Sequence, residues 1–587
     1  MRRSEFILGA LAAARPLRSA SDWRDSIAFA VPADDTPRSA LAVRRRWKDG
    51  RCESAVINRG NRPARIREVV LFSFEHGYAP DTALYGESFQ MLSQTGGTLG
   101  QPADLGYSER RHYRIPQPEP AAALSGVVTL TPAGGETDLF AFTSCRRFHG
   151  RFLLLPGRLQ VVLETEGLTL APGESWPLEE FLHLRGSDRS RLLARLAEHI
   201  NRNHPPLRLP ASPPTGWCSW YCFGPRVTAT QVLANLDAIA SAIPGLRYIQ
   251  IDDGYQSAMG DWLDTGAAFG GDVLAVIRKI RERGFEPALW VAPFIAEAGS
   301  RLFRAHPDWF MKDSAGAPMS SDRVTFGGWR RGPWFALDGT HPEVQRHLET
   351  LFRTMRNEWG VTYFKMDANF WGAMHGARLH DGAATRIEAY RRGMEAIVRG
   401  AGDSFLLGCN HPIWPSFGLL HGSRSSDDIS RRWDLFDRVA RQNLNRNWQN
   451  GRLWWNDPDA VVLDGTLPEN EFRFHATAAY ASGGMILSGD DLTRIPPDRL
   501  AMLRKLLPAR GVAAEFTDAS LRIGYMQFPD ALHIAVLNPT PSPQRLRVPL
   551  PRAGTITELW TGTALGRRER AIETELPPRC GAVFVCA

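Results

Sequence analysis

Carboxylic side chains follow short apolar segments at several points in the second half of the chain. Residues 247–251 lead directly into Asp252 and Asp253, and residues 362–366 lead into Asp367. Three later apolar segments are followed in the same way by Asp427 and Asp428, by Asp457, and by Asp490 and Asp491. A single aspartate after a strand is commonly only the N-cap of the next helix. Five segments that all end this way favour a shared polar site.

Two carboxyl groups that face one another can cleave a glycosidic bond, one as nucleophile and the other as acid and base. Asp367 suits the nucleophile. Lys365 lies two residues before it, and alternate residues of a strand point the same way. A nearby ammonium keeps a carboxylate ionised. An aspartate from the run 426–428, expected across the site, suits the second role, and these residues alone leave Asp427 and Asp428 both open.

Metal-dependent chemistry is a poorer match to this pattern. It would need histidine and carboxylate ligands that converge on one point. Only His411 follows a predicted strand, and no cysteine pair has the C-x-x-C spacing typical of zinc sites. We therefore expect no metal and no other cofactor.

The segments between about residues 215 and 510 alternate short apolar strands with longer amphipathic helices, as in a parallel α/β domain. Eight strand–helix units over this length predict a (β/α)8 TIM barrel, whose active site lies at the carboxyl ends of the strands. Helices are expected at residues 229–242, 273–283, 341–359, 384–399 and 471–482. The eight strands are expected at residues 216–220, 247–251, 287–292, 362–366, 404–408, 422–425, 452–455 and 485–488.

The flanking parts of the chain show short strands separated by glycine and proline turns, which is typical of β-sandwiches. An N-terminal β-sandwich is expected at residues 21–186 and a small C-terminal β-sandwich at residues 511–587. Residues 187–214 are predicted to be a helical linker that ends in a proline-rich stretch, and residues 215–510 the catalytic barrel. The predicted fold class is therefore multidomain α/β, with a central barrel between two β-sandwiches.

The composition of the 587 residues, 43% hydrophobic and 23% charged, is that of a globular protein. The 18 tryptophans suit sugar binding as well as core packing, because flat rings stack on sugar C–H faces. Net charge is +7, but the basic residues are scattered, which disfavours a nucleic-acid partner. No apolar run reaches the roughly 20 residues of a membrane span.

The N-terminus has the pattern of a targeting segment. Arg2 and Arg3 precede an apolar run at residues 6–14, which resembles a twin-arginine export signal over residues 1–20. The resemblance predicts a periplasmic or secreted protein; without a functional signal the protein would be cytoplasmic. The seven cysteines leave at least one thiol free, and a bridge between Cys580 and Cys586 stays open.

The motifs along the barrel resemble those of glycoside hydrolase family 36 in clan D, the bacterial α-galactosidases, and more distantly family 27. They occur in the family's order and extend over the whole predicted barrel, between a β-sandwich on either side as in that family. The matching segments are GWCSWY at 216–221, IDDGY at 251–255, GDW at 260–262, WVAPF at 290–294, LDGTHPEV at 337–344, FKMD at 364–367 and RSSDD at 424–428.

This resemblance implies a retaining exo-glycosidase that releases terminal α-linked galactose from oligosaccharides or glycoconjugates by double displacement. Asp367 matches the family's nucleophile. Asp428 matches its acid/base, because Arg424 stands four residues before it. Asp427 is kept as the alternative acid/base, and both Arg424 and Asp427 are sugar-binding candidates. The other sugar-binding roles that the resemblance implies fall on Asp252 and Asp253 for O4 and O6, Lys365 as a hydroxyl donor, and Trp220 as a wall.

The loop after the fifth predicted strand departs from the family. Many members carry a cysteine and a glycine-rich stretch there, near C2 of the sugar, whereas this chain has Cys409 and Asn410 followed by His411 and Trp414. Cys409 and Asn410 are therefore sugar-binding candidates. The bulk of Asn410, His411 and Trp414 favours galactose over N-acetylgalactosamine.

Three other functions fit parts of the pattern. They are an α-N-acetylgalactosaminidase of the same clan, a transglycosylase related to raffinose synthases, and a catalytically inactive sugar-binding barrel. The presence of Asp367 and of the Asp427-Asp428 pair disfavours the inactive barrel. The expected partner is an α-galactoside substrate, and the sequence does not determine its aglycone or its linkage. Assembly into a homo-oligomer also stays open.

Overall fold

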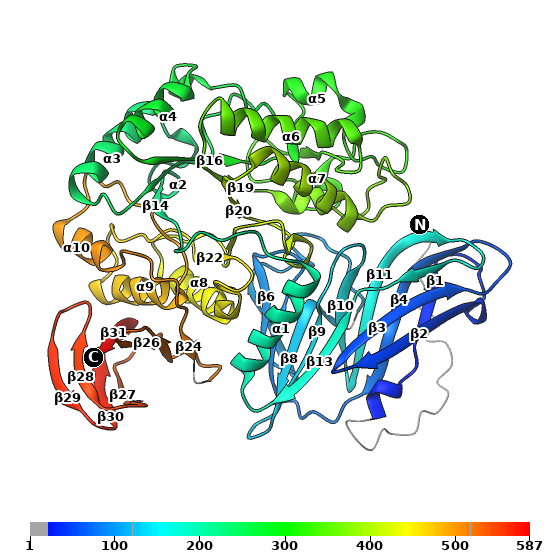
Figure 1. The fold of residues 1–587 in the computed structure, drawn as a ribbon, viewed down its shortest axis with the longest axis horizontal. Helices are drawn as coiled ribbons and strands as arrows, with labels where there is room; N and C mark the ends of the chain where they lie inside the picture. Colours follow the sequence, from blue (N-terminus) through cyan, green and yellow to red (C-terminus); the bar gives the residue numbers. More distant parts are fainter. Residues whose placement is uncertain (1–21, 120, 517) are drawn as a thin grey trace.

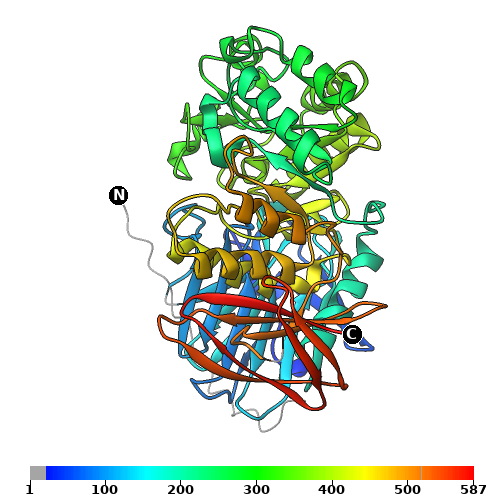
Figure 2. The same ribbon diagram turned by 90° about the vertical axis from the view of Figure 1, so that its left-hand side faces the viewer.

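The computed structural model describes residues 22–119, 121–516 and 518–587 (Figure 1). The export signal predicted at residues 1–20 lies outside the described residues. The chain forms an N-terminal antiparallel sheet, a parallel sheet surrounded by helices, and a C-terminal antiparallel sheet. In Figures 1 and 2 the N-terminal strands (blue and cyan) and the C-terminal strands (red) lie on the same side of the helical part.

The N-terminal sheet system has 13 strands in the described residues, and all its pairings are antiparallel. Buried and more exposed side chains alternate along the third strand, because successive side chains of a strand point to opposite faces of the sheet. The strands are β1 (Phe29–Pro32), β2 (Leu41–Lys48), β3 (Arg51–Asn58), β4 (Ala64–Glu75), β5 (Ala83–Glu87), β6 (Ser93–Thr98), β7 (Gln101–Gly106), β8 (Ala122–Thr131), β9 (Thr137–Phe142), β10 (His149–Leu155), β11 (Arg158–Leu170), β12 (Ser175–Pro177) and β13 (Phe181–Gly186).

The central sheet has eight strands that pair in parallel, in the order β22-β21-β20-β19-β16-β15-β14-β23. The Met485 amide, just before β23, donates to the Asn456 carbonyl of β22 at 2.8 Å and so joins the two ends of this order. The strands are β14 (Thr215–Cys218), β15 (Tyr248–Ile251), β16 (Glu286–Val291), β19 (Tyr363–Met366), β20 (Phe405–Gly408), β21 (Gly422–Arg424), β22 (Trp455–Asp457) and β23 (Ile486–Ser488).

Helices follow most of these strands, and two of them begin with a capping box, Thr228 with Gln231 and Thr385 with Glu388. The predicted helices begin and end within two residues of those observed. The helices are α1 (Arg189–Asn203), α2 (Trp220–Phe223), α3 (Ala229–Ala242), α4 (Val273–Glu282), α5 (Arg301–Ala305), α6 (Pro342–Asn357), α7 (Arg386–Ala401), α8 (Trp433–Asn445), α9 (Glu469–Ser482) and α10 (Pro497–Lys505).

The expectation of a multidomain α/β chain with a barrel-like parallel sheet is thus confirmed, while the predicted domain limits remain predictions. One strand was placed wrongly: residues 452–455 were expected to form the seventh strand, but β22 begins at Trp455. The preceding Leu453 and Trp454 are buried in a turn, in which the Gly451 amide donates to the Trp454 carbonyl at 2.8 Å. An apolar run alone does not distinguish a buried turn from a strand.

The C-terminal part consists of antiparallel strands in a six-stranded and a two-stranded sheet, and β31 packs on α9. Cys580 and Cys586 lie at opposite ends of β31, roughly 20 Å apart at the rise of an extended strand. Both thiols are free, so the bridge left open above does not form. The strands are β24 (Glu515–Phe516), β25 (Ile523–Gln527), β26 (Leu532–Asn538), β27 (Gln544–Pro549), β28 (Gly554–Glu558), β29 (Ala564–Arg568), β30 (Ala571–Leu576) and β31 (Cys580–Cys586).

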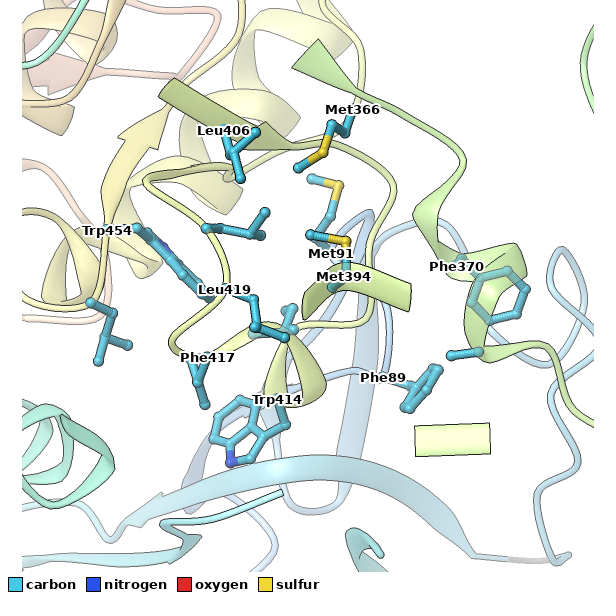
Figure 3. Packing of buried hydrophobic residues seen from close by; sticks show 14 of the residues in the cluster. Phe89, Met91, Met366, Phe370, Met394, Leu406, Trp414, Phe417, Leu419 and Trp454 are labelled. Carbon is cyan, nitrogen blue, oxygen red and sulfur yellow. The ribbon is translucent and has the colours of Figure 1, made fainter. Parts of the chain in front are cut away.

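The N-terminal sheet and the barrel share one hydrophobic core. Figure 3 shows Met91, which follows β5, beside Met366 of the barrel strands and Met394 of α7, and Phe89 beside Phe370, which follows β19. All five side chains are at most 1% exposed. Close packing of this kind fixes the segment after β5 against the barrel. Within the described ranges, every helix is too short or too polar to cross a membrane.

Candidate active site

A cavity of about 210 Å³ lies at the carboxyl ends of the barrel strands. Residues from β15, β16, β19 and β20, or from the loops just after them, line it together with residues of the N-terminal sheet. The lining residues are Leu92, Tyr107, His112, Tyr113, Trp220, Asp252, Asp253, Trp290, Phe326, Trp329, Lys365, Asp367, Cys409, Asn410 and Asp428. This is where catalytic residues of such barrels lie.

A larger cavity of about 410 Å³ lies elsewhere, between the end of α1, one side of α7 and the segment around Phe417. No residue from the carboxyl ends of the barrel strands lines it. The smaller cavity is therefore the candidate active site.

Asp252 and Lys365 form a buried ion pair on the floor of this cavity. The Lys365 Nζ lies 2.9 Å from Asp252 Oδ2, which also accepts a hydrogen bond from the Gln250 amide at 2.7 Å. Burial opposes the charged ammonium, but the Asp252 carboxylate outweighs it and raises the pKa of Lys365 well above its ordinary value. Lys365 therefore stays a cation that can donate to a bound hydroxyl.

Asp367 follows β19 directly and is held by two donors. The indole Nε1 of Trp290 donates to Oδ2 at 3.1 Å, and the Ala368 amide donates to Oδ1 at 2.7 Å. Ala368 has a φ of 53°, a left-handed conformation that a residue with a Cβ rarely adopts. Such strain is frequent at active sites. Burial raises the pKa of Asp367, whereas the Lys365 ammonium acts against that rise.

Asp253 lines the same cavity and forms an ion pair with a cation of its own, Arg330. Arg330, from the segment before β18 (Trp334–Ala336), binds both carboxylate oxygens, with Nε 2.9 Å from Oδ2. The Gln256 amide donates to Oδ1 at 2.6 Å. Asp253 is only 1% exposed, so Arg330 balances a charge that would otherwise be buried alone.

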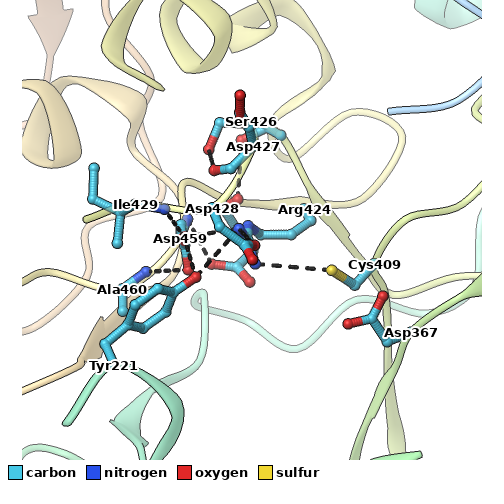
Figure 4. A network of polar contacts seen from close by, with 12 residues as sticks. Tyr221, Asp367, Cys409, Arg424, Ser426, Asp427, Asp428, Ile429, Asp459 and Ala460 are labelled. Atoms are coloured by element: carbon cyan, nitrogen blue, oxygen red, sulfur yellow. Dashed lines mark hydrogen bonds and ion pairs between the residues drawn. The ribbon is translucent and has the colours of Figure 1, made fainter. Parts of the chain in front are cut away.

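Figure 4 shows a polar network around the buried side chain of Arg424, at the end of β21. One guanidinium nitrogen, Nη2, lies 2.7 Å from Asp428 Oδ1 and 2.7 Å from Asp459 Oδ2. The Tyr221 hydroxyl donates to Asp459 Oδ2, and the Ile429 amide donates to the same oxygen at 2.7 Å. Asp428 and Asp459 therefore share one cation.

The two acids of this network have opposite pKa shifts. Burial raises the pKa of Asp459 to about 6. Desolvation also favours the neutral form of Asp428, but the Arg424 guanidinium prevails and holds the pKa of Asp428 below its ordinary value. Both carboxylates bind the same Arg424 nitrogen, so the protonation of one changes the charge that the other meets.

Asp428 and Asp427 point in different directions. The Asp428 side chain is 61% exposed and lines the cavity. Asp427 is 1% exposed, pairs with Arg438 of α8 at 2.7 Å and is absent from the cavity lining. Burial raises the pKa of Asp427 to about 7. The structure therefore brings only one of the two predicted acid/base candidates to the cavity, and it does not bring Asp427 to a sugar-binding position. Arg424 likewise lies beneath the lining.

The loop after β20 contributes Cys409 and Asn410 to the cavity. His411 instead turns inward, where its ring nitrogens contact Ser416 and Ser423. Trp414 packs against the N-terminal sheet, and its indole donates to the Phe142 carbonyl at 2.8 Å. The expectation that His411 and Trp414 restrict the space near C2 is therefore wrong, because tertiary packing turns both side chains away.

Several residues that line the cavity or lie beneath its lining were not expected from the sequence. Asp459 follows the misplaced strand β22, and its motif Asp457-Pro458-Asp459 at a strand end was a usable signal. Trp290 lies within the recognised segment 290–294 but was given no role. Leu92, Tyr107, His112 and Tyr113 come from the N-terminal sheet system, about 140 residues or more before the nearest barrel aspartate, and no motif marks them.

A family model described as Melibiase matches residues 231–394. The chain contains a melibiase domain. The matched part of this domain includes Asp252, Asp253, Lys365 and Asp367, whereas Asp428 lies beyond it. The resemblance to α-galactosidases is confirmed by this match and by curated relatives of that name.

Curated relatives match between 22% and 56% of the chain. An "A type blood alpha-D-galactosamine galactosaminidase" from Flavonifractor plautii is 26% identical over 355 residues, which are 56% of this chain and 32% of that protein. The matched regions cover only 22% to 32% of the first three curated relatives.

Solved structures match more of the chain. TtGalA, an α-galactosidase from Thermus thermophilus in complex with stachyose, is 25% identical with a TM-score of 0.62, covering 79% of this chain and 99% of that one. The galactosidase domain of AgaSK, from Mediterraneibacter gnavus, is 15% identical with a TM-score of 0.63, covering 94% of this chain and 81% of that one. The latter likeness concerns the fold alone.

Proposed function

We propose that this protein is a retaining exo-acting α-galactosidase, with Asp367 as nucleophile and Asp428 as acid/base. The observation that carries the proposal is that both carboxyl groups line one small cavity whose floor is the Asp252–Lys365 ion pair. The negative charge of Asp428 also contributes to the raised pKa of Asp367, so the two groups are close enough to influence one another. The relatedness to α-galactosidases and galactosaminidases supports the same chemistry.

In the first step the Asp367 carboxylate attacks the anomeric carbon and the bond from that carbon to the leaving oxygen breaks. Asp428 gives its proton to that oxygen, and a covalent glycosyl ester remains on Asp367. Trp290 and the Ala368 amide orient the attacking carboxylate by the hydrogen bonds that they donate to it.

In the second step a water molecule attacks the same carbon and gives its proton to Asp428, which now acts as base. The ester bond to Asp367 breaks, galactose leaves with its original anomeric configuration, and both carboxyl groups return to their starting states. The proton on Asp428 is drawn from the Asp428–Asp459 pair, which Arg424 holds together.

Two hydroxyl groups of the sugar would bind the aspartates on the floor. A carboxylate offers about four acceptor positions. Lys365, Gln250 and the Cys218 thiol occupy Asp252 Oδ2, while among the described residues Oδ1 accepts only the Asp253 amide and retains one position. Asp253 Oδ2 accepts a hydrogen bond only from Arg330 within the part of the chain that the structure describes, and it likewise retains one position. These two positions fit O4 and O6 of galactose.

An equatorial O4, as in glucose, would miss its acceptor and leave a buried carboxylate position unpaired. A site built to accept a hydroxyl rejects a substrate that cannot supply it by roughly two orders of magnitude or more. We therefore expect kcat/KM for a 4-nitrophenyl α-glucoside to be at least about 100-fold below that for the α-galactoside. Equal rates would contradict this assignment of Asp252 and Asp253.

A galactosaminidase is the second candidate, because the relative from Flavonifractor plautii carries that name. With His411 and Trp414 turned away, Cys409 and Asn410 are the lining residues of the loop near C2. The ratio of kcat/KM for aryl α-galactoside and aryl α-N-acetylgalactosaminide separates the two functions, and we expect the galactoside to be faster. The opposite ratio would change the substrate and leave the mechanism unaltered.

Covalent trapping tests the nucleophile directly. A fluorinated galactoside that forms a slowly hydrolysed ester should add one sugar to the peptide that contains Asp367, detected by mass spectrometry after digestion. Asp367→Asn should take up no label, whereas the matched variant Asp403→Asn, at a side chain 85% exposed, should be labelled like wild type. A label on another residue would contradict the assignment.

A further inference from the structure

Two large aromatic side chains are exposed at the rim of the active-site cavity. Among the described residues the large hydrophobic side chains that are exposed are Ile27, Tyr107, Leu263 and Trp329, and two of these four line this cavity. Tyr107 is 37% exposed and Trp329 is 38% exposed. Exposed aromatic surface at the edge of a cavity is typical of a ligand contact rather than of core packing.

Tyr107 is the outer ring of a stack of three. The His112 ring lies 4.4 Å from it, with the two planes inclined by 22°. The Phe326 ring lies 4.1 Å from His112, inclined by 30°. Tyr107 and His112 belong to the N-terminal sheet system and Phe326 to the segment before β18, so the stack joins two parts of the chain. A ring supported in this way is pre-organised to receive a flat partner on its open side.

Gln442 of α8 ties this N-terminal segment to the loop that carries Asp428. Its Nε2 donates to the carbonyls of Leu92 and Leu105, at 3.1 Å in each case. Its Oε1 accepts from the Asp427 amide at 2.9 Å. Gln442 is fully buried, so one side chain sets the position of Tyr107, two residues after Leu105, relative to Asp428.

Arg446, one turn further along the chain, repeats the connection. It pairs with Glu87 of β5 at 2.6 Å, and both side chains are at most 1% exposed. The same guanidinium donates to the Met91 and Ser93 carbonyls and, at 3.0 Å, to the carbonyl of Ser425 in the Asp428 loop. Two buried side chains thus hold the N-terminal segment and the acid/base loop as one unit.

The Gln442 hydrogen bonds, with the 3.1 Å bond from the Tyr107 amide to the Leu92 carbonyl, place Tyr107 on the side of the cavity where the Asp428 loop lies. Burial, followed by the negative charges of Asp427 and Asp428, raises the pKa of the Tyr107 phenol. An acid/base delivers its proton to the oxygen of the bond being broken, so the leaving group sits beside it. Tyr107 is therefore placed to contact the leaving group rather than the galactose.

We propose that Tyr107, supported by His112, forms a leaving-group subsite in which the next sugar ring of an oligosaccharide stacks on the open face of the phenol. The proposal rests on the proposed glycosidase function and adds to it a determinant of substrate choice. Sugar rings present C–H faces that pack on aromatic rings, while their hydroxyls stay at the wet rim. The N-terminal sheet system of the same chain thus selects among α-galactosides, while the barrel performs the cleavage.

Tyr107→Ala tests the subsite by comparing two substrates. One is raffinose, whose leaving group begins with a sugar ring, and the other is α-galactosyl fluoride, whose leaving group has no ring. We expect the ratio of kcat/KM for raffinose to that for the fluoride to fall by about tenfold relative to wild type. The ratio cancels any loss of folded protein, since both substrates report on the same enzyme.

Two further variants isolate the ring. Tyr107→Phe keeps the aromatic face and should hold the ratio within about threefold of wild type. Leu263→Ala removes an equally exposed apolar side chain, 43% exposed, that does not line the cavity, and should leave the ratio unchanged. A fall in Tyr107→Phe as large as in Tyr107→Ala would replace stacking by a role of the hydroxyl and overturn the proposal.

The outcomes separate the subsite from the function. If wild type cleaves α-galactosyl fluoride and Tyr107→Ala leaves the ratio unaltered, the subsite is wrong and the α-galactosidase function stands. If wild type releases galactose from neither substrate, the function fails and the subsite falls with it. If the ratio falls in Tyr107→Ala but stays near the wild-type value in Tyr107→Phe and in Leu263→Ala, the result supports both the subsite and the α-galactosidase function.

Discussion

The floor and the N-terminal wall of the cavity are built in different ways. The floor consists of residues at or just after barrel strands, among them Asp252, Lys365 and Asp367, each held by short hydrogen bonds or ion pairs. The wall consists of Leu92, Tyr107, His112 and Tyr113, which lie in connections of the N-terminal sheet system and present mostly rings. Groups that carry charge in the reaction are fixed by the regular scaffold, whereas groups that contact the variable part of a substrate lie on irregular segments.

This division predicts how variants differ. Changes in the floor should slow every substrate, because they remove the chemistry common to all. Changes in the wall should alter the ranking of substrates with different leaving groups. Changes in the contacts that join the two should lower stability.

Asp367→Asn should have the largest effect on the floor. Without a nucleophile no glycosyl ester forms, so kcat should fall by several powers of ten on raffinose and on α-galactosyl fluoride alike. The midpoint of thermal unfolding should remain near that of wild type, since the amide keeps the shape of the side chain. A loss confined to one of the two substrates would break the distinction between floor and wall.

Asp428→Ala should show an asymmetric effect that depends on the leaving group. General acid catalysis contributes about 10²–10⁴-fold, and a substrate with a good leaving group does not need it in the first step. Raffinose should therefore suffer far more than α-galactosyl fluoride in single-turnover measurements of the first step. Azide should restore turnover and give α-galactosyl azide. The same behaviour in Asp427→Ala, and not in Asp428→Ala, would exchange the two roles.

Arg446→Ala should weaken the junction between floor and wall. It leaves Glu87 buried without its cation, which costs about 3–5 kcal/mol of unfolding free energy. Arg441→Ala, on the same helix, removes an exposed pair with Asp437 and should cost at most about 1 kcal/mol. Urea unfolding of the two variants measures the difference. Equal losses would mean that the buried pair does not hold the two parts together.

The pH dependence should be bell-shaped and is the smallest of these effects. The first step needs a proton on the Asp428–Asp459 pair, so kcat/KM for raffinose should fall as pH rises through about 6. On the acid side the rate should fall as Asp367 takes up a proton. Because the pKa of Asp367 is raised, this fall should occur at a higher pH than for an ordinary aspartate. α-Galactosyl fluoride should lack the alkaline decline. A raffinose profile that stays level to pH 8 would contradict the shared proton.

Much of the floor could be predicted from the sequence, because the spacing of two residues along a strand determines whether their side chains point to the same face. Lys365 and Asp367 are two residues apart, so they face the same side, and a strand of a parallel sheet ends where the other strands end. The alternation of strands and helices likewise follows from hydrophobic periodicity, which is local. The misplaced seventh strand shows the limit of such patterns: Leu453 and Trp454 are as apolar as strand residues but are buried in a turn.

The sequence by itself determined the alternation of strands and helices in the barrel and the aspartates that follow several of its strands. Only the tertiary structure decided which of those aspartates reach the cavity. Asp428 reaches it, while the adjacent Asp427 turns to Arg438, because Gln442 holds the Asp427 amide from the side of α8. Tyr107 and His112 were likewise undetectable, since the segment that carries them is held at the site by contacts of Leu92 and Leu105 with α8 that span more than 300 residues. Spacing along a strand fixes direction within a few residues, whereas the position of a loop depends on whatever distant surface it packs against.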